Sequence, residues 1–178
     1  YIVDKSKERL EQLSKMFGDK IIPQHSGSTN LEKLISECDL LVGGVLIPGA
    51  EAPKLVTKEM IKSMKRGSVV VDVAIDQGGC IETSKPTTHA NPTYLVDDVV
   101  HYCVANMPGG VPRTSTMALN KAILPLLLKL ANQGYKKTLI ENKNYLSGLN
   151  VYKGSITHKG VSDAFNLKFC DAYELLKQ

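Results

Sequence analysis

Short, nearly continuous runs of branched apolar residues alternate with segments of helical periodicity through the first two thirds of the chain. The runs at 40–46 and 68–75 carry apolar side chains at almost every position. Strands of this kind are buried on both faces, and short helices between them are typical of a parallel sheet. The alternation therefore predicts an α/β fold, with a doubly wound parallel sheet over roughly residues 1–112.

The same pattern places the individual elements. We expect strands at 1–3, 40–46, 68–75 and 99–107, with a weaker apolar run at 21–22, and helices at 5–17, 31–38 and 58–65. Asn30 and Thr57 directly precede the second and third helix, and side chains of these types cap helix N-termini. Gly67 is expected to end the third helix.

The character of the sequence changes after Pro112. A long amphipathic helix is expected over 117–133, ended by Gly134, with Pro125 either kinking it or marking its first turn. Shorter helices are expected at 139–146, 162–165 and 172–178, without another sheet pattern. This tail looks like a separate helical unit joined by the long helix.

Charge, apolar run length and cysteine spacing exclude several classes of protein. Lys and Arg number 22 against 18 Asp and Glu, and the cations are scattered among the acids, so a dedicated nucleic-acid surface is not expected. No apolar run reaches the length of about 18 residues that a membrane span needs. The four cysteines are widely spaced and form no Cys-x-x-Cys, which predicts reduced thiols of a cytoplasmic protein rather than a zinc site or a disulfide framework.

Polar residues and glycines follow the expected strands, where the ligand site of a doubly wound sheet lies. These segments are Asp4, Gly43-Gly44, 76–79 and 106–108. An acid at the position of Asp4 can accept hydrogen bonds from the ribose hydroxyls of a dinucleotide, but Asp is also a common helix cap. The nearby cations Lys5, Lys7 and Arg9 would instead favour a ribose phosphate, so the choice of cofactor is open at this point.

Asp76 is the sharpest candidate for chemistry. It follows eight mostly apolar residues and precedes Gln77-Gly78-Gly79. Beside a nicotinamide, its carboxylate can stabilise a developing iminium, orient water or take a proton; the alternative is a capping Asp. Of the histidines, His101 lies inside an apolar strand and is expected to be a hydrogen-bonded core residue, whereas His89 can be either structural or functional. No Gly-x-Gly-x-x-Gly phosphate loop is present.

Five stretches, 39–56, 67–80, 86–89, 104–108 and 111–116, together resemble the alanine dehydrogenases of the alanine dehydrogenase/transhydrogenase family. The likeness continues into the tail at 148–154. It implies a Rossmann domain, NAD as cofactor and no metal. The implied reaction is the reversible oxidative deamination of L-alanine to pyruvate and ammonia, in a homo-oligomer that is typically a hexamer.

The resemblance also implies roles for individual residues, with Asp76 as the catalytic carboxylate. The implied cofactor contacts are Asp4, Arg9, Ser26, Val45, Leu46, Val73, Ala74, Ile75, Asp76, Val104, Ala105, Asn106 and Met107. Arg9 stands where the family commonly has Lys. Transhydrogenase nucleotide domains carry Gln-Asn-Gly-Gly where this chain has residues 76–79, and a hydride transfer between two nucleotides needs no acid to handle an amine. Asp76 therefore favours the deaminase branch.

Two parts of the family pattern are missing: the N-terminal substrate domain, and the first Rossmann strand with its glycine-rich loop. Because the sequence opens at Tyr1 inside a strand-like run, we expect it to be the C-terminal half of a longer enzyme. Residues 1–113 would then form an incomplete NAD-binding domain, and residues 114–178 the long linking helix and the C-terminal part of the substrate domain.

The missing strand would be the central one, leaving 1–4 and 39–45 facing a gap. The chain by itself is expected neither to bind NAD tightly nor to turn over substrate, because it needs its N-terminal half. Two alternatives stay open: a transhydrogenase-like nucleotide-binding domain, and a non-catalytic split-gene module that pairs with another chain.

Overall fold

The computed structural model describes residues 1–177, with the exception of 28–29, 46, 48 and 50. A pair of parallel strands, β1 (Ile2–Asp4) and β2 (Pro23–His25), begins the chain. They are joined by α1 (Lys7–Phe17) and the short 3₁₀ helix η1 (Gly18–Lys20). This pair shares no strand with the larger sheet among the described residues.

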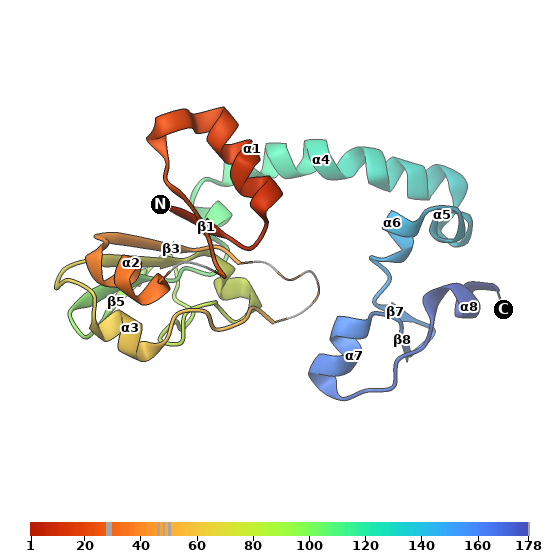
Figure 1. Cartoon of the computed structure of the whole chain (residues 1–178). Coiled ribbons are helices and arrows are strands. Elements are labelled where there is room, and N and C mark those ends of the chain that lie inside the picture. Colours follow the sequence, from red (N-terminus) through yellow and green to blue (C-terminus); the bar gives the residue numbers. More distant parts are fainter. Residues whose placement is uncertain (28–29, 46, 48, 50, 178) are drawn as a thin grey trace.

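The larger sheet has four strands in the order β3-β4-β6-β5. β3 (Leu40–Gly43), β4 (Val69–Asp72) and β6 (Val99–Tyr102) run parallel, which confirms the predicted parallel α/β architecture. β5 (Thr93–Val96) pairs antiparallel with β6. The helices α2 (Leu31–Glu37) and α3 (Lys58–Lys62) precede β3 and β4 (Figure 1).

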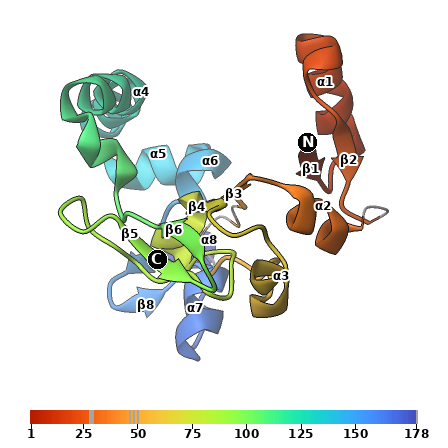
Figure 2. The same cartoon turned by 90° about the vertical axis from the view of Figure 1, so that its left-hand side faces the viewer.

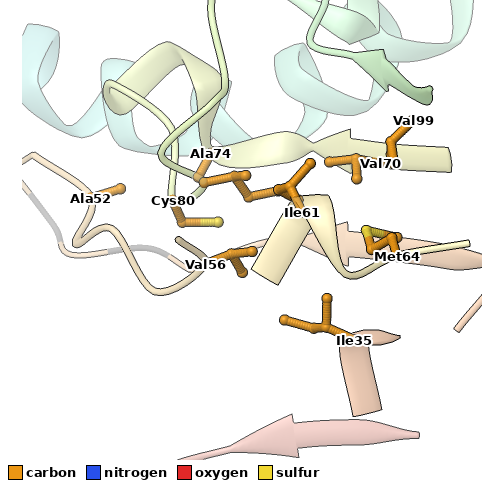
Figure 3. Close-up of a cluster of buried hydrophobic side chains, with 10 residues drawn as sticks. Ile35, Ala52, Val56, Ile61, Met64, Val70, Ala74, Cys80 and Val99 are labelled. Atoms are coloured by element: carbon orange, nitrogen blue, oxygen red, sulfur yellow. The ribbon is translucent and has the colours of Figure 1, made fainter. Parts of the chain in front are cut away.

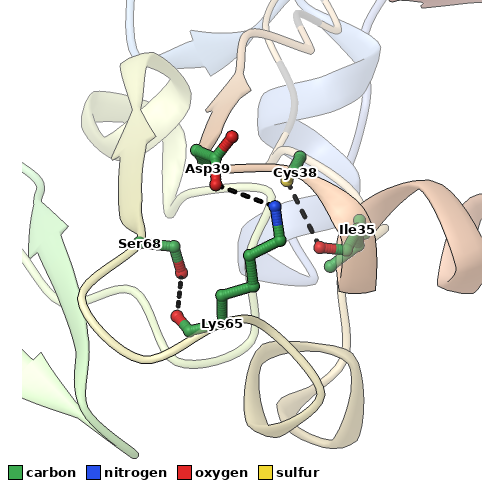
Figure 4. Close-up of polar contacts among 5 residues, drawn as sticks. All are labelled: Ile35, Cys38, Asp39, Lys65 and Ser68. Carbon is green, nitrogen blue, oxygen red and sulfur yellow. Dashed lines mark hydrogen bonds and ion pairs between the residues drawn. The ribbon is translucent and has the colours of Figure 1, made fainter.

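Local capping fixes the starts of these helices, and one ion pair joins segments beside the sheet. Asn30 Oδ1 accepts from Lys33 N at 3.0 Å and Thr57 Oγ1 from Met60 N at 3.2 Å, so both predicted caps are confirmed. After α3, Lys65 Nζ binds Asp39 Oδ1 at 2.9 Å (Figure 4). The segment that follows α3 is thereby tied to the start of β3.

The main core lies between the four-stranded sheet and the helices α2 and α3. Ile61, Val70 and Val99 are fully buried there, and Ile35 is almost so (Figure 3). Ile81 is also fully buried in this cluster. The segments 52–56 and 80–81 complete the cluster from the loops beyond the carboxyl ends of the strands. The candidate chemistry therefore lies directly beyond well-packed strands.

Three expected strands of the larger sheet end earlier than predicted, and one of its strands was missed. The strand expected over 40–46 ends at Gly43. The run 68–75 stops being a strand at Asp72, whose side chain accepts from Ala74 N at 3.1 Å and turns the chain into the 3₁₀ helix η2 (Val73–Gln77). The strand expected to reach 107 ends at Tyr102, and the 3₁₀ helix η3 (Met107–Gly110) follows. β5 was missed; it forms a tight hairpin with β6, whose two turn residues Asp97 and Asp98 both have positive φ.

The long helix α4 (Pro112–Gln133) begins five residues earlier than expected, because Pro112 occupies its first position, where proline needs no hydrogen-bond donor. Pro125 lies in the helix interior, so it does not mark the first turn. Gly134 ends α4 as predicted, and α5 (Tyr135–Glu141), α6 (Lys143–Leu146), α7 (Lys159–Phe165) and α8 (Ala172–Lys177) follow.

The expectation of no further sheet in the tail is wrong. β7 (Val151–Tyr152) and β8 (Ser155–Ile156) form a small antiparallel hairpin, turned by Lys153 and Gly154 at positive φ. We refer to the elements α5 to α8, after Gly134, as the C-terminal unit. Thr138, Leu139 and Leu176 are among its buried residues. No helix in the described part of the chain is long and apolar enough to cross a membrane.

The gap expected beside 1–4 and 39–45 is present. β1 pairs only with β2, and β3 pairs only with β4, so each strand keeps one open edge among the described residues. Figure 2 shows β1, β2 and α1 standing to one side of the four-stranded sheet. Leu40 and Val42 of β3 are 57% and 56% exposed.

Candidate functional site

Asp76 lies in the 3₁₀ helix beyond β4, in a loop whose shape is set by the buried Asp72. That carboxylate is inaccessible to solvent and accepts three backbone N–H groups, from Ala74 at 3.1 Å, Cys80 at 3.0 Å and Ile81 at 3.2 Å. A buried carboxylate is costly unless it is hydrogen-bonded in this way. Asp72 therefore folds the segment 73–81 back over the end of its own strand.

Lys54 fastens the same loop from the other side. Its Nζ donates to the carbonyl oxygens of Gly78 and Gly79, the second at 2.9 Å. The backbone of the segment around Lys54 adds two bonds, from Ala52 N to the oxygen of Gln77 at 2.9 Å and from Leu55 N to that of Cys80 at 2.8 Å. The loop that carries Asp76 is thus held at both flanks.

The side chain of Asp76 itself is exposed and turned toward the end of β6. Its Oδ1 accepts from Asn106 N at 3.3 Å, and Oδ2 has no hydrogen-bond partner within the described residues. The capping interpretation is wrong for Asp76, because the cap of this 3₁₀ helix is Asp72. Asp76 therefore keeps one carboxylate oxygen available to a ligand or to water.

Asp4 and Ser26 meet at the carboxyl ends of β1 and β2. Asp4 Oδ1 accepts from Ser6 N at 2.7 Å, and Ser26 N donates to the Asp4 carbonyl at 3.0 Å. The cap of α1 is Ser6, so Asp4 is not a helix cap. Arg9 Nη1 binds Gln12 Oε1 at 3.1 Å along the surface of α1.

The other predicted contact residues differ in how far they can reach a ligand. Ala74, Ile75 and Val104 are buried, so only their backbone can face one. Val73 is exposed, while Val45, Ala105 and Met107 are half-buried, and Leu46 lies outside the described residues. The structure joins Asp76 with Asn106, and Asp4 with Ser26, but no hydrogen bond joins the two pairs in the part of the chain that it describes.

These positions fit two parts of a dinucleotide. The unpaired oxygen of Asp76 and the backbone at 104–107 lie beyond β4 and β6, and Asp4 lies at the end of β1. Among the described residues, none outside the immediate chain neighbours comes within 4 Å of a Cβ placed on Gly44, beyond β3, so a ligand can approach this backbone closely. This is the edge of a doubly wound sheet at which nucleotides bind.

The sequence reasoning missed Asp72, Lys54 and the contact between Asp76 and Asn106. A signal for Asp72 was present, since a charged residue inside the run 68–75 must be satisfied by nearby donors. No sequence signal indicated the contacts of Lys54 and Asn106, because these contacts depend on how distant loops fold. His101 is confirmed as a hydrogen-bonded core residue.

The cysteines are all free thiols, and Cys80 and Cys103 are buried. Burial and the nearby Asp72 carboxylate raise the pKa of the Cys80 thiol. In the described part of the chain, no group of three or more His, Cys, Asp and Glu side chains could hold a metal ion.

Comparison with known sequences gives a consistent set of relatives. The family model described as alanine dehydrogenase/PNT, C-terminal domain, matches residues 1–159. The chain is 53% identical over 175 residues to an alanine dehydrogenase of Halomonas elongata, covering 98% of this chain and 47% of that protein. It is 52% identical over 177 residues to alanine dehydrogenase 2 of Staphylococcus aureus strain USA300, covering 99% of this chain and 48% of that one.

Comparison with solved structures gives relatives of the same kind. An L-alanine dehydrogenase superposes with a TM-score of 0.78 at 48% identity, over 93% of this chain and 45% of that one. A transhydrogenase from Sinorhizobium meliloti superposes with a TM-score of 0.64 at 24% identity, over 88% of this chain and 41% of that one, and shares the fold. The chain spans about half the length of the curated relatives that it matches.

Proposed function

Because the chain belongs to the alanine dehydrogenase/PNT C-terminal domain family, we propose that it is the cofactor-side part of an NAD-dependent alanine dehydrogenase. The reaction is the reversible oxidative deamination of L-alanine to pyruvate and ammonia. The observation that carries this proposal is the exposed carboxylate of Asp76, held through one oxygen by Asn106 N and available through the other.

Asp76 is the proposed catalytic carboxylate. NAD, when bound, supplies the acceptor for the hydride that leaves the amino acid. The Asp76 side chain beside it stabilises the positive charge that develops on the substrate nitrogen, and its unpaired oxygen orients the attacking water or accepts a proton from it. A nucleotide-to-nucleotide hydride transfer needs no such group, so the transhydrogenase-like alternative is less supported.

The proposed NAD contacts lie at the strand ends described above. Asp4 accepts hydrogen bonds from the adenosine ribose, with Arg9 and Ser26 beside it. Val45 contributes backbone near the nucleotide, the segment 73–76 lies on the nicotinamide side, and 104–107 forms the last turn that contacts the cofactor. Ala74, Ile75 and Val104 contribute through their backbone because their side chains are buried.

We further propose that the active enzyme needs a segment outside this sequence. The open edges of β1 and β3 fit one inserted parallel strand, which would bond the free backbone groups at both edges. The substrate-binding groups and a homo-oligomeric, typically hexameric, assembly belong to that complete protein. A reducing compartment such as the cytoplasm suits its four free cysteines.

The substitution Asp76→Asn in the full-length protein tests the catalytic role. We expect alanine-dependent NADH formation to fall by about 100-fold or more, the scale of a lost acid–base group, while the Kd for NADH changes less than about threefold. Asp19→Asn, which removes an exposed carboxylate in η1, is the matched control and should leave both quantities unchanged. Near-normal turnover of Asp76→Asn would refute the assigned role.

The same experiment distinguishes the alternatives. Alanine-dependent NADH formation by the unsubstituted protein supports the dehydrogenase. NADH binding without alanine turnover points to the non-catalytic module, and hydride exchange between NADH and an NADP analogue without alanine points to a transhydrogenase.

A further inference from the structure

His89 ends the Pro86-Thr87-Thr88-His89 segment and has no role in the function proposed above. In the structure its Nε2 lies 3.0 Å from the carbonyl oxygen of Asn106. A carbonyl oxygen only accepts hydrogen bonds, so Nε2 must carry a proton and donate it. The histidine is thus bonded to the backbone of the residue that binds Asp76.

Asn106 has an unusual backbone conformation, with φ 54° and ψ 52°. This left-handed region is disfavoured for a residue with a Cβ, although Asn tolerates it better than most. The conformation directs the Asn106 N–H to Asp76 Oδ1. It directs the Asn106 carbonyl to two donors, Gly109 N at 2.8 Å and His89 Nε2.

The imidazole of His89 lies against the backbone of Gly109 and Gly110. A Cβ on Gly109 would come within 3.4 Å of Nε2, and one on Gly110 within 3.2 Å of Cε1. The two glycines therefore leave room for the ring. A Cβ at Gly110 would crowd the imidazole, whereas one at Gly109 would be in ordinary contact with it and would press on Asn106 Nδ2 at 3.2 Å.

The loop that carries His89 is itself attached to the segment after β6. Thr87 N donates to the Cys103 carbonyl at 2.9 Å, and Ala105 N donates to the Thr87 carbonyl at 3.1 Å. Thr87 Oγ1 closes the loop by donating to the Pro92 carbonyl at 2.9 Å. His89 therefore approaches Asn106 from a fixed base.

We propose that His89 is a positioning residue for Asp76. By donating from Nε2 to the Asn106 carbonyl it holds the left-handed turn, and that turn aims the Asn106 N–H at the Asp76 carboxylate. The role rests on the proposed function, because it matters for catalysis only if Asp76 acts on substrate. The hydrogen-bond chain itself, from His89 through the backbone of Asn106 to Asp76, is independent of any reaction.

The test compares variants of the full-length protein that keep or lose the donor. His89→Phe keeps an aromatic ring without a donor, His89→Ala removes ring and donor together, and His89→Gln places an amide N–H near the position of Nε2. We expect kcat for alanine deamination to fall about 10- to 100-fold in the Phe and Ala variants, the cost of a misplaced reacting group. The KM for alanine should change less than about threefold, and His89→Gln should stay within about threefold of the unsubstituted kcat.

A second readout does not depend on activity. Without cofactor, hydrogen–deuterium exchange at the Asn106 amide should be faster in the Phe and Ala variants and near normal in His89→Gln. An unchanged exchange rate in both donor-free variants would overturn the proposal. So would equal losses in His89→Gln and His89→Phe, since the donor would then be irrelevant.

The two proposals fail in different ways. If the unsubstituted protein shows no alanine turnover, the proposed function fails, and the exchange rates still decide whether His89 holds the turn. If the unsubstituted protein is active and the donor-free variants are equally active, the positioning role of His89 fails and the dehydrogenase assignment stands.

Discussion

At the scale of single residues, Gly43 shows how tightly the end of β3 is packed. A Cβ at this position would lie 2.5 Å from Cys80 Sγ, closer than two such atoms can approach. Cys80 is buried, and its Sγ lies 3.6 Å from Asp72 Oδ1, so it has little room to move away. Gly43 thus permits the contact between β3 and the loop that carries Asp76.

We therefore expect Gly43→Ala to lower the free energy of unfolding by about 1–3 kcal/mol, the usual cost of overpacking a core. Urea unfolding measures this. The neighbouring Gly44→Ala is the matched control, because no atom of the described residues outside its chain neighbours lies within 4 Å of a Cβ there, and its φ is not positive. If the two variants unfold at the same urea concentration, the contact has no energetic weight. Adding Cys80→Ala to Gly43→Ala should restore part of the loss.

His101 is a second residue whose effect follows from its surroundings. It is inaccessible to solvent, with Nδ1 3.0 Å from the Val99 carbonyl and Nε2 2.8 Å from Thr83 Oγ1. Nδ1 donates to the carbonyl, so Nε2 accepts from the threonine hydroxyl. The ring also stacks on Tyr94 at a centroid distance of 5.1 Å. Burial lowers the pKa of His101 below its ordinary value of 6.5.

The lowered pKa of His101 determines how its contribution to stability changes with pH. Because the pKa of His101 is lower in the folded chain, the unfolded chain protonates it more readily as the pH falls through about 6.5. The unfolded state then binds more protons, and stability falls as the pH is lowered. Urea unfolding at pH 8, 6.5 and 5.5 measures this. The contribution of His101 should lower the free energy of unfolding only below about pH 6.5. His101→Gln should reduce that loss. An equal loss in both proteins would assign it to other groups.

At the scale of elements, the loop 73–81 depends on groups that are far apart in the sequence. Asp72 ends β4 by accepting three N–H groups, and Lys54 binds two carbonyls of the same loop from the segment before α3. The strand therefore stops where a side chain satisfies the backbone, rather than where the apolar run ends. Asp76 is presented by this loop, not by the strand itself.

The open edge of β3 gives a prediction for that strand. In the chain of residues 1–178 alone, the backbone amides of β3 that face away from β4 should exchange with deuterium quickly, because they have no partner strand among the described residues. In the full-length protein we expect them to be protected at least about tenfold more, since an inserted strand would bond them.

Val70 in β4 provides the internal control. It lies in the middle of the four-stranded sheet and is fully buried, so its protection should be similar in both proteins. Tight NADH binding and slow β3 exchange in the isolated chain would contradict the need for a further strand.

At the scale of the whole molecule, α4 links the sheet to the C-terminal unit (Figure 1). At its far end Tyr145 donates to the Leu126 carbonyl at 3.2 Å, and Lys129 lies over the Tyr145 ring. Yet no residue of this 22-residue helix is buried. Its exposed large apolar residues are Met117, Leu119, Ile123, Leu124, Leu126, Leu127 and Leu128. A helix with so much exposed apolar surface suits the proposal that the chain works as part of a larger assembly.

The amino-acid sequence was enough to predict the parallel α/β architecture, the capping by Asn30 and Thr57, and the positions of Asp4 at the end of one strand and Asp76 beyond another. These features follow from hydrophobic periodicity and from bonds that span only a few residues, which any short segment carries within itself. The resemblance to the alanine dehydrogenases also rests on short stretches that follow one another along the chain.

The assembly of the site depends on contacts between distant parts of the folded chain. The tertiary structure ended β4 at Asp72, added β5 to the sheet, and brought His89, Asn106 and Asp76 into one chain of hydrogen bonds. Asp76 and Asn106 are 30 residues apart, and their contact depends on where two loops fold over the sheet. Because loops satisfy their polar groups with whatever donors the packed fold places nearby, no local pattern predicts such contacts.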